Sequence, residues 1–188
     1  MDFETLIETH GLWLLWLGCA IEGEAVAVAG GVLEHRGVFG FWPVIAAVAA
    51  GGWTSDLLVY AGGRAFRGHP RVTRFTGHPR TVRLTGRLLR RPALLAAVFR
   101  FVPGARTVTP LALATASGLP AVAYAAITLV AAVVWALLAV SMGHGVGVLL
   151  AALFGHLSEL DAVTLGAAAG LGLAALLWVW HRRRRART

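Results

Sequence analysis

Two arginines lie in the middle of a long apolar stretch of the chain. The segment FRFVPGARTVTP, residues 99–110, places Arg100 and Arg106 on either side of Pro103 and Gly104. A guanidinium group holds two phosphate oxygens in one plane, and the backbone N–H groups left open by a broken helix also favour anions. The segment therefore predicts a binding site for a phosphate group at a break in the backbone.

Three acids in the first third of the chain are candidate partners of these arginines. Glu22 and Glu24 flank Gly23 in the sequence IEGEA, and Asp56 follows in a second apolar stretch. Ionisable side chains inside a membrane cost at least about 2.5 kcal/mol each to insert, so they mark functional positions by default. We expect the acids to exchange protons or to neutralise the arginines. The plainer alternative is that all five charges only hold the hairpins together as structural ion pairs.

The composition is that of an integral membrane protein. Of 188 residues, 57% are hydrophobic and 14% are charged, which lies outside the range of soluble domains. Runs without Asp, Glu, Lys or Arg occur at 37–55, 107–158 and 162–180. They lack the alternation of barrel strands and are long enough for helices that cross a bilayer, which takes about 20 residues. One cysteine, Cys19, leaves no multi-cysteine metal site, and we expect neither a metal nor a cofactor.

The arginine clusters constrain the topology. Nine arginines and no acid lie between Arg64 and Arg91, and the last eight residues, HRRRRART, hold five more. Both clusters should be cytoplasmic, so an even number of crossings must separate them. Three apolar segments lie between them, at 92–118, 120–142 and 162–180. The first contains the arginines and interior prolines, which break helices, so we expect it to enter and leave by the same face.

The N-terminal half repeats this arrangement. Residues 11–33 are apolar except for the acids at their centre, and a cleaner span follows at 37–60. The fold class we expect is all-α, with two re-entrant hairpins in an inverted repeat, about three transmembrane helices and a basic cytoplasmic amphipathic segment. We expect residues 1–188 to form a single membrane domain. Its parts are an acidic hairpin with a helix at 12–62, the basic segment at 64–91, an arginine-containing hairpin with a helix at 92–143, and a helix with a basic tail at 160–188.

The basic segment contains its own repeat, GHPRVTRFTG at 68–77 and GHPRTVRLTG at 77–86. Its arginines recur at spacings of three and four, which places them along one helical face. We expect this face to lie on anionic lipid headgroups. Nucleic acid is not an expected partner because the segment has few aromatic residues between its arginines.

Three stretches of the chain resemble the DedA family, also called the SNARE-associated or VTT-domain proteins. They are IEGEAVAVAGGVLEHRG, SDLLVYAGGRAFRG and FRFVPGARTVTPLALATASGLP, followed by Trp135. The resemblance covers about residues 12–140 and implies that the family's essential acids fall on Asp56 and on Glu22 or Glu24, and its arginines on Arg100 and Arg106. Departures are Ser55 and Ser117 in place of the usual glycine and alanine, and the missing proline before Gly-Glu.

The resemblance implies lipid translocation in a bacterial cytoplasmic membrane, with the C-terminus inside. The substrate it implies is undecaprenyl (polyprenyl) phosphate, and it links the family to the proton-motive force. A less selective phospholipid scramblase and a non-catalytic membrane-organising protein stay open as alternatives, and so does assembly as a homo-oligomer. A lipid phosphate phosphatase is disfavoured because the chain has no lysine to clamp the phosphate, and SMGHG at 141–145 has no carboxylate near it in sequence. We therefore expect a transporter and no enzyme.

Overall fold

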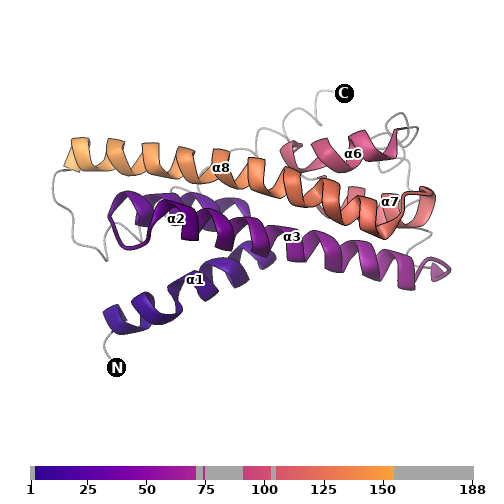
Figure 1. Cartoon of the computed structure of the whole chain (residues 1–188), viewed down its shortest axis with the longest axis horizontal. Helices are drawn as coiled ribbons and strands as arrows, with labels where there is room; N and C mark the ends of the chain where they lie inside the picture. The colour runs from indigo at the N-terminus through magenta and orange to yellow at the C-terminus, as the bar shows by residue number, and fades with distance from the viewer. Residues whose placement is uncertain (1–2, 71–73, 75–90, 103–104, 155–188) are drawn as a thin grey trace. The chain divides into compact units, whose positions relative to one another are not determined.

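The computed structural model describes residues 3–70, 74, 91–102 and 105–154, and every regular element in these ranges is helical (Figure 1). Several predictions fall on residues outside them: the break at Pro103 and Gly104, most of the basic segment at 64–91, and the helix and tail at 160–188. The elements are α1 (Phe3–Ile21), α2 (Glu24–His35), α3 (Phe41–Ala65), α6 (Pro92–Val98), the 3-10 turn η2 (Phe99–Phe101), α7 (Val108–Ala116) and α8 (Ala121–Phe154).

The helices α1 and α2 form a hairpin that turns at Gly23. Its φ of 90° lies in the region that favours glycine, and the residue ends α1 while its carbonyl accepts the first hydrogen bond of α2, from Ala27. The two helices pack closely because Gly18 has no side chain: a Cβ there would lie 2.9 Å from Val26. The predicted turn in IEGEA is therefore present. Whether the hairpin is re-entrant stays a prediction.

Among the residues that the structure describes, two helices are long and apolar enough to cross a bilayer, namely α3 over Phe41–Ala65 and α8 over Ala121–Ala152. At about 1.5 Å per residue, 25 residues extend beyond a hydrocarbon core of about 30 Å. They overlap the spans expected at 37–60 and 120–142 with shifted bounds, because α3 begins only at Phe41 and α8 continues to Phe154. By contrast, α2, α6 and α7 have 12, 7 and 9 residues, which is too short for a crossing.

A second pair of short helices contains the arginines. Pro92 begins α6, a position where its missing N–H costs nothing, and α6 tightens into η2 before the backbone becomes extended at Val102. After the break, α7 begins at Val108 and packs against α6. The arginine stretch thus contains two short helices that do not run on into each other. The predicted break at Pro103 and Gly104 lies outside the described residues, and Pro110 lies within the first turn of α7 and does not interrupt it.

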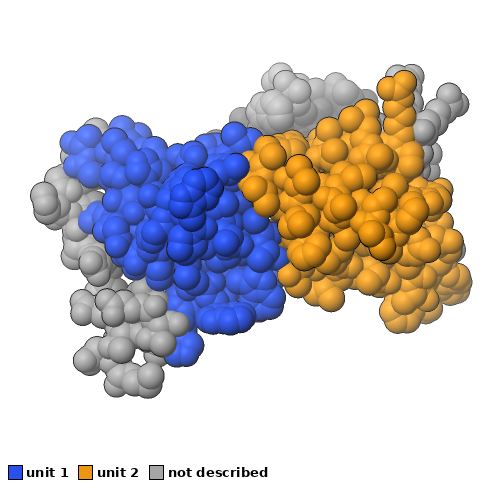
Figure 2. Space-filling view, in the orientation of Figure 1, with its two compact units in different colours: residues 1–51, 136–188 blue, residues 52–135 orange. Residues whose placement is uncertain are grey.

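The chain divides into two compact units (Figure 2). Unit 1 consists of Met1–Gly51 and Ala136–Thr188, and unit 2 of Gly52–Trp135. Both α3 and α8 contribute residues to each unit. The core of unit 2 is formed by buried side chains from α3, α6, α7 and α8, together with the link before α8: Tyr60, Leu95, Ala96, Leu113, Ala114, Leu119 and Tyr124.

Candidate functional site

An ion pair between Asp56 and Arg100 lies inside unit 2. Nη2 of Arg100 donates to Oδ2 of Asp56 across 2.5 Å, and the two residues are 7% and 1% exposed. Asp56 comes from the middle of α3, and Arg100 comes from η2, where the short helix before the break ends. The structure thus brings together one predicted acid and one predicted arginine that are 44 positions apart.

This pair makes fewer hydrogen bonds than its groups allow. Oδ1 of Asp56 and Nε of Arg100 are buried, and neither has a hydrogen-bond partner within the described ranges. A carboxylate and a guanidinium commonly form two parallel bonds, and a buried polar atom without a partner costs about 1–3 kcal/mol. The site therefore has capacity for a further polar group at both residues.

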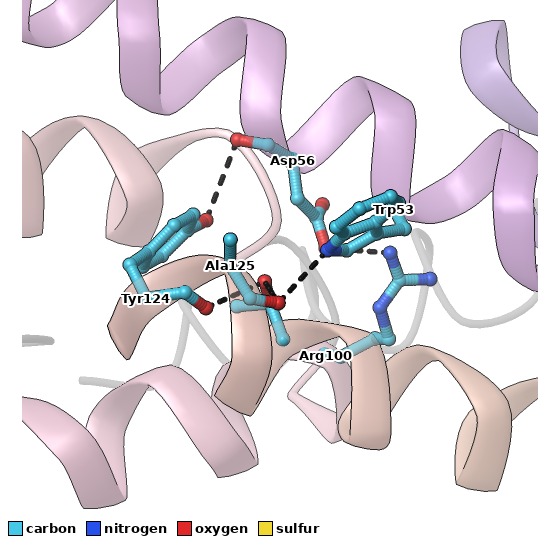
Figure 3. A network of polar contacts seen from close by, with 6 residues as sticks. Trp53, Asp56, Arg100, Tyr124 and Ala125 are labelled. Carbon is cyan, nitrogen blue, oxygen red and sulfur yellow. Dashed lines mark hydrogen bonds and ion pairs between the residues drawn. The ribbon is translucent and has the colours of Figure 1, made fainter. Parts of the chain in front are cut away.

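The backbone around Asp56 is fixed to α8 by hydrogen bonds on either side of the ion pair (Figure 3). The indole N–H of Trp53 donates to the carbonyl of Ala125 over 3.0 Å, and the hydroxyl of Tyr124 donates to the carbonyl of Asp56 over 3.4 Å. The hydroxyl of Thr128 donates to the Tyr124 carbonyl, one turn back on α8. These contacts hold the Asp56 side chain at a defined position between two helices.

One turn further along α3, Tyr60 stacks on Tyr124 with ring centroids 3.9 Å apart. The Tyr60 hydroxyl donates to the carbonyl of Leu119 over 2.8 Å. Sequence analysis gave neither tyrosine a role. The available signal was spacing, because Tyr60 lies four residues after Asp56 and so on the same helical face.

Two arginines at and just after the end of α3 donate hydrogen bonds to backbone carbonyls at the end of α7 and in the link that follows it. Arg67 donates to the Ala114 carbonyl from both Nε, over 3.2 Å, and Nη2, over 2.5 Å. Arg64 donates to the Leu119 carbonyl over 3.4 Å. Carbonyls in the last turn of a helix lack intrahelical partners, and cations are favoured there. Arg67 therefore stabilises the last turn of α7, whereas Arg64 holds the link between α7 and α8.

Arg106 is half-buried in the same unit, and its charge attracts that of Asp56. Glu22 and Glu24 belong to unit 1, where both are exposed beside the Gly23 turn. Glu24 occupies the first turn of α2, where a carboxylate is favoured by the helix dipole. A part for these two acids in the site stays a prediction.

Unit 1 has a separate polar contact, between α2 and α8. Nδ1 of His144 lies 2.6 Å from Oε2 of Glu34, and the His35 and His144 rings meet edge to face at 4.8 Å. Two glycines bring the helices together: a Cβ at Gly31 would strike the carbonyl of Val140, and it would lie 2.8 Å from the Cα of Gly143. Among the described residues, no three His, Cys, Asp or Glu side chains gather as metal ligands.

Comparisons with known proteins cover most of these elements. A model of the VTT domain matches residues 21–145. The chain is 34% identical to the inner membrane protein YohD of Escherichia coli (strain K12) over 152 residues, which are 80% of this chain and 78% of that protein. No solved structure matches. Both the Asp56–Arg100 pair and the Glu34–His144 contact lie within the matched region.

Proposed function

The chain belongs to the VTT-domain (DedA) family of membrane proteins, and we propose that it moves polyprenyl phosphate across the cytoplasmic membrane. In this proposal Arg100 and Arg106 bind the phosphate and the prenyl tail stays in the lipid. The C-terminus lies in the cytoplasm, and arginines of the 64–91 segment contact anionic headgroups.

The observation that carries the proposal is the incomplete buried pair of Asp56 and Arg100. Taking two charges out of water costs several kcal/mol per ion, and only well-formed bonds compensate for it. Here one bond is made, while Oδ1 of Asp56 and Nε of Arg100 are left over. A buried ion pair with unpartnered polar atoms lowers the stability of the fold. We expect such a pair at a functional site, where a charged ligand competes for the carboxylate or the guanidinium.

A phosphate monoester suits this competition. It carries a charge of about −1.5 to −2 and three acceptor oxygens, so it attracts two arginines more strongly than one carboxylate does. When the phosphate takes Arg100, with Arg106 as the second cation, Asp56 is left without its partner. A proton on Asp56 then removes the buried negative charge, and this links lipid binding to proton uptake. Glu22 and Glu24 would exchange protons with water at the Gly23 turn.

The short helices support a site reached from both faces of the bilayer. With 12, 7 and 9 residues, α2, α6 and α7 fall short of the bilayer core. We propose that the α1–α2 and α6–α7 hairpins are each re-entrant, since non-helical backbone at membrane depth must be surrounded by protein or by a water-filled cavity. A headgroup could then cross without entering the hydrocarbon.

The test is lipid translocation by the purified full-length protein in liposomes at several pH values. Labelled polyprenyl phosphate and labelled phospholipid are followed from one leaflet to the other, with Arg100→Gln and Arg106→Gln beside the wild type. We expect polyprenyl phosphate to move, and each substitution to slow it by about tenfold or more at equal abundance, since each removes a charge-assisted bond.

Other outcomes assign other functions. Equal movement of both lipids would make the protein an unselective scramblase. Movement of neither lipid contradicts the proposal and favours a membrane-organising role. Release of inorganic phosphate from the lipid would indicate a phosphatase.

A further inference from the structure

Gly52 provides the space in which the guanidinium of Arg100 lies. A Cβ atom at Gly52 would be 2.5 Å from Nη1, 2.9 Å from Nη2 and 3.1 Å from Cζ of Arg100. Such an atom would be nearer to both terminal nitrogens than to the central carbon. The missing side chain therefore corresponds to a place just off the end of the guanidinium fork, and not to one above its plane.

This space, the Gly52 notch, lies one helical turn before Asp56. Residues four apart on a helix share a face, so the notch and the carboxylate are neighbours along α3. The end of the fork is directed at the notch, and Nη2 reaches Oδ2 of Asp56 from there. Nε lies on the side of the guanidinium, away from the end of the fork, and it has no hydrogen-bond partner among the residues described.

A second contact also restrains the guanidinium. Cζ of Arg100 lies over the ring of Trp135, 5.3 Å from its centroid, a distance at which a cation is attracted by the aromatic face. Neither Gly52 nor Trp135 uses the Nε edge of the fork. Both contacts limit where the cation can lie, and they leave Nε as a buried donor without a partner among the described residues.

We propose that Gly52 is a positioning residue, whose notch seats the terminal nitrogens of Arg100 against α3. In the lipid-free protein this lets Nη2 pair with Asp56 while Nε is presented to an incoming phosphate oxygen, and the bound phosphate then competes with Asp56 for the rest of the fork. The role toward phosphate rests on the proposed function, and the seating of the fork against α3 does not. Any side chain at position 52 would push the fork away from α3. Because the obstructing group is the far end of a flexible side chain, the arginine would move while the helix stays intact.

The substitution Gly52→Ala tests this directly, and the chain offers a matched control. Gly62 lies on the same helix, and a Cβ there would meet nothing within 4 Å. In both cases alanine raises the helix propensity of α3 equally. A difference between Gly52→Ala and Gly62→Ala therefore reports the contact with Arg100 and not the change of residue type.

The first readout is the coupling between Asp56 and Arg100, measured by a double-mutant cycle of SDS unfolding in micelles. Asp56→Asn, Arg100→Gln and the pair are compared in three backgrounds: wild type, Gly52→Ala and Gly62→Ala. We expect most of the coupling to be lost in Gly52→Ala and kept in Gly62→Ala. Equal coupling energies between Asp56 and Arg100 in the Gly52→Ala and Gly62→Ala backgrounds overturn the proposal.

The second readout needs no unfolding. In protein labelled with ¹⁵N at arginine, the Nε–H resonance that vanishes in Arg100→Lys identifies Arg100. Gly52→Ala should shift this resonance, whereas Gly62→Ala should leave it in place. If the Arg100 Nε–H resonance of Gly52→Ala has the same chemical shift as that of the wild type, the proposal is also overturned. This readout applies even if one variant of the double-mutant cycle fails to fold.

The third readout is binding of a short-chain polyprenyl phosphate to the full chain in detergent. Gly52→Ala should weaken binding by about 10- to 100-fold, the effect of losing a charge-assisted hydrogen bond, and should have little further effect in an Arg100→Lys background, which lacks the fork. If the wild type binds no polyprenyl phosphate, the proposed function fails, while the coupling and the resonance still decide the role of Gly52. If the wild type binds and Gly52→Ala binds equally well, presentation of the Nε edge is wrong.

Discussion

Tyr60 and Tyr124 stack with their ring planes 10° apart, directly beside the buried ion pair. Tyr60 belongs to the helix that contributes Asp56, and Tyr124 hydrogen-bonds the Asp56 carbonyl. Both side chains are buried. The stack thus joins α3 to α8 one helical turn from Asp56.

Removing the stacked ring should destabilise unit 2 more than removing the hydroxyl. We expect Tyr124→Leu to lower the free energy of unfolding by about 2–4 kcal/mol, as large-to-small changes in a core do. Tyr124→Phe should cost less than about 1.5 kcal/mol, because it loses one long hydrogen bond. SDS unfolding in micelles measures both. Equal losses for the two variants would mean that the hydroxyl and not the stack joins the helices.

Trp135 should act on Arg100 through the face of its ring. Trp135→Phe keeps an aromatic face and should retain most of the binding of polyprenyl phosphate. Trp135→Leu removes the cation–π attraction, worth about 0.5–2 kcal/mol, and should weaken binding by about 2- to 30-fold. Binding titrations with both variants at matched folded fractions check this. The expectation is wrong if the two variants bind alike.

The contact between α2 and α8 in unit 1 should tolerate no side chain at Gly31. A Cβ there would strike backbone on α8, and backbone cannot move aside as a flexible side chain can. We expect Gly31→Ala to destabilise the protein by about 1–3 kcal/mol, as overpacking does. Gly145→Ala on α8 is the control, since a Cβ there meets nothing within 4 Å. It should leave the free energy of unfolding unchanged or raise it by up to about 1 kcal/mol. Equal stability of the two variants would contradict this account of the contact.

Arg67 should stabilise the end of α7. Arg67→Gln removes a cation and at least one of two hydrogen bonds to the Ala114 carbonyl, which should cost about 0.5–2 kcal/mol. The measurement is unfolding, with hydrogen exchange at α7 as a local readout. Faster exchange confined to α7 is the expected pattern. Exchange at α7 that matches the wild type would show that water replaces the arginine without cost.

Local features of the fold were predictable because they depend on residues close in sequence. The turn in IEGEA that ends α1 follows from Gly23. An interruption near η2 was expected from the prolines in that stretch, and the long apolar runs predicted the helices α3 and α8. The third expected span and the basic tail lie outside the described residues. The re-entrant paths stay predictions, since no bilayer accompanies the chain.

The pairing of charges was predictable in kind but not in detail. Sequence patterns named three acids and two arginines, yet the choice of Asp56 for Arg100 depends on how α3 and η2 approach in space. The same holds for Tyr60 with Tyr124 and for Glu34 with His144, which are far apart in the chain. The role of Gly52 could not be predicted from the sequence. It is one of 23 glycines in a chain rich in small residues, where a glycine most simply indicates close packing of helices.

Competition for Arg100 is the central claim, and equilibrium binding of a short-chain polyprenyl phosphate in detergent tests it most directly. Wild type, Arg100→Gln and Asp56→Asn are compared. We predict opposite effects: Arg100→Gln weakens binding by about 10- to 100-fold, whereas Asp56→Asn strengthens it, because the competing carboxylate is gone and the buried cation is left without its counter-charge. Unchanged binding in Arg100→Gln, or a loss of binding in Asp56→Asn as large as that in Arg100→Gln, would contradict the account.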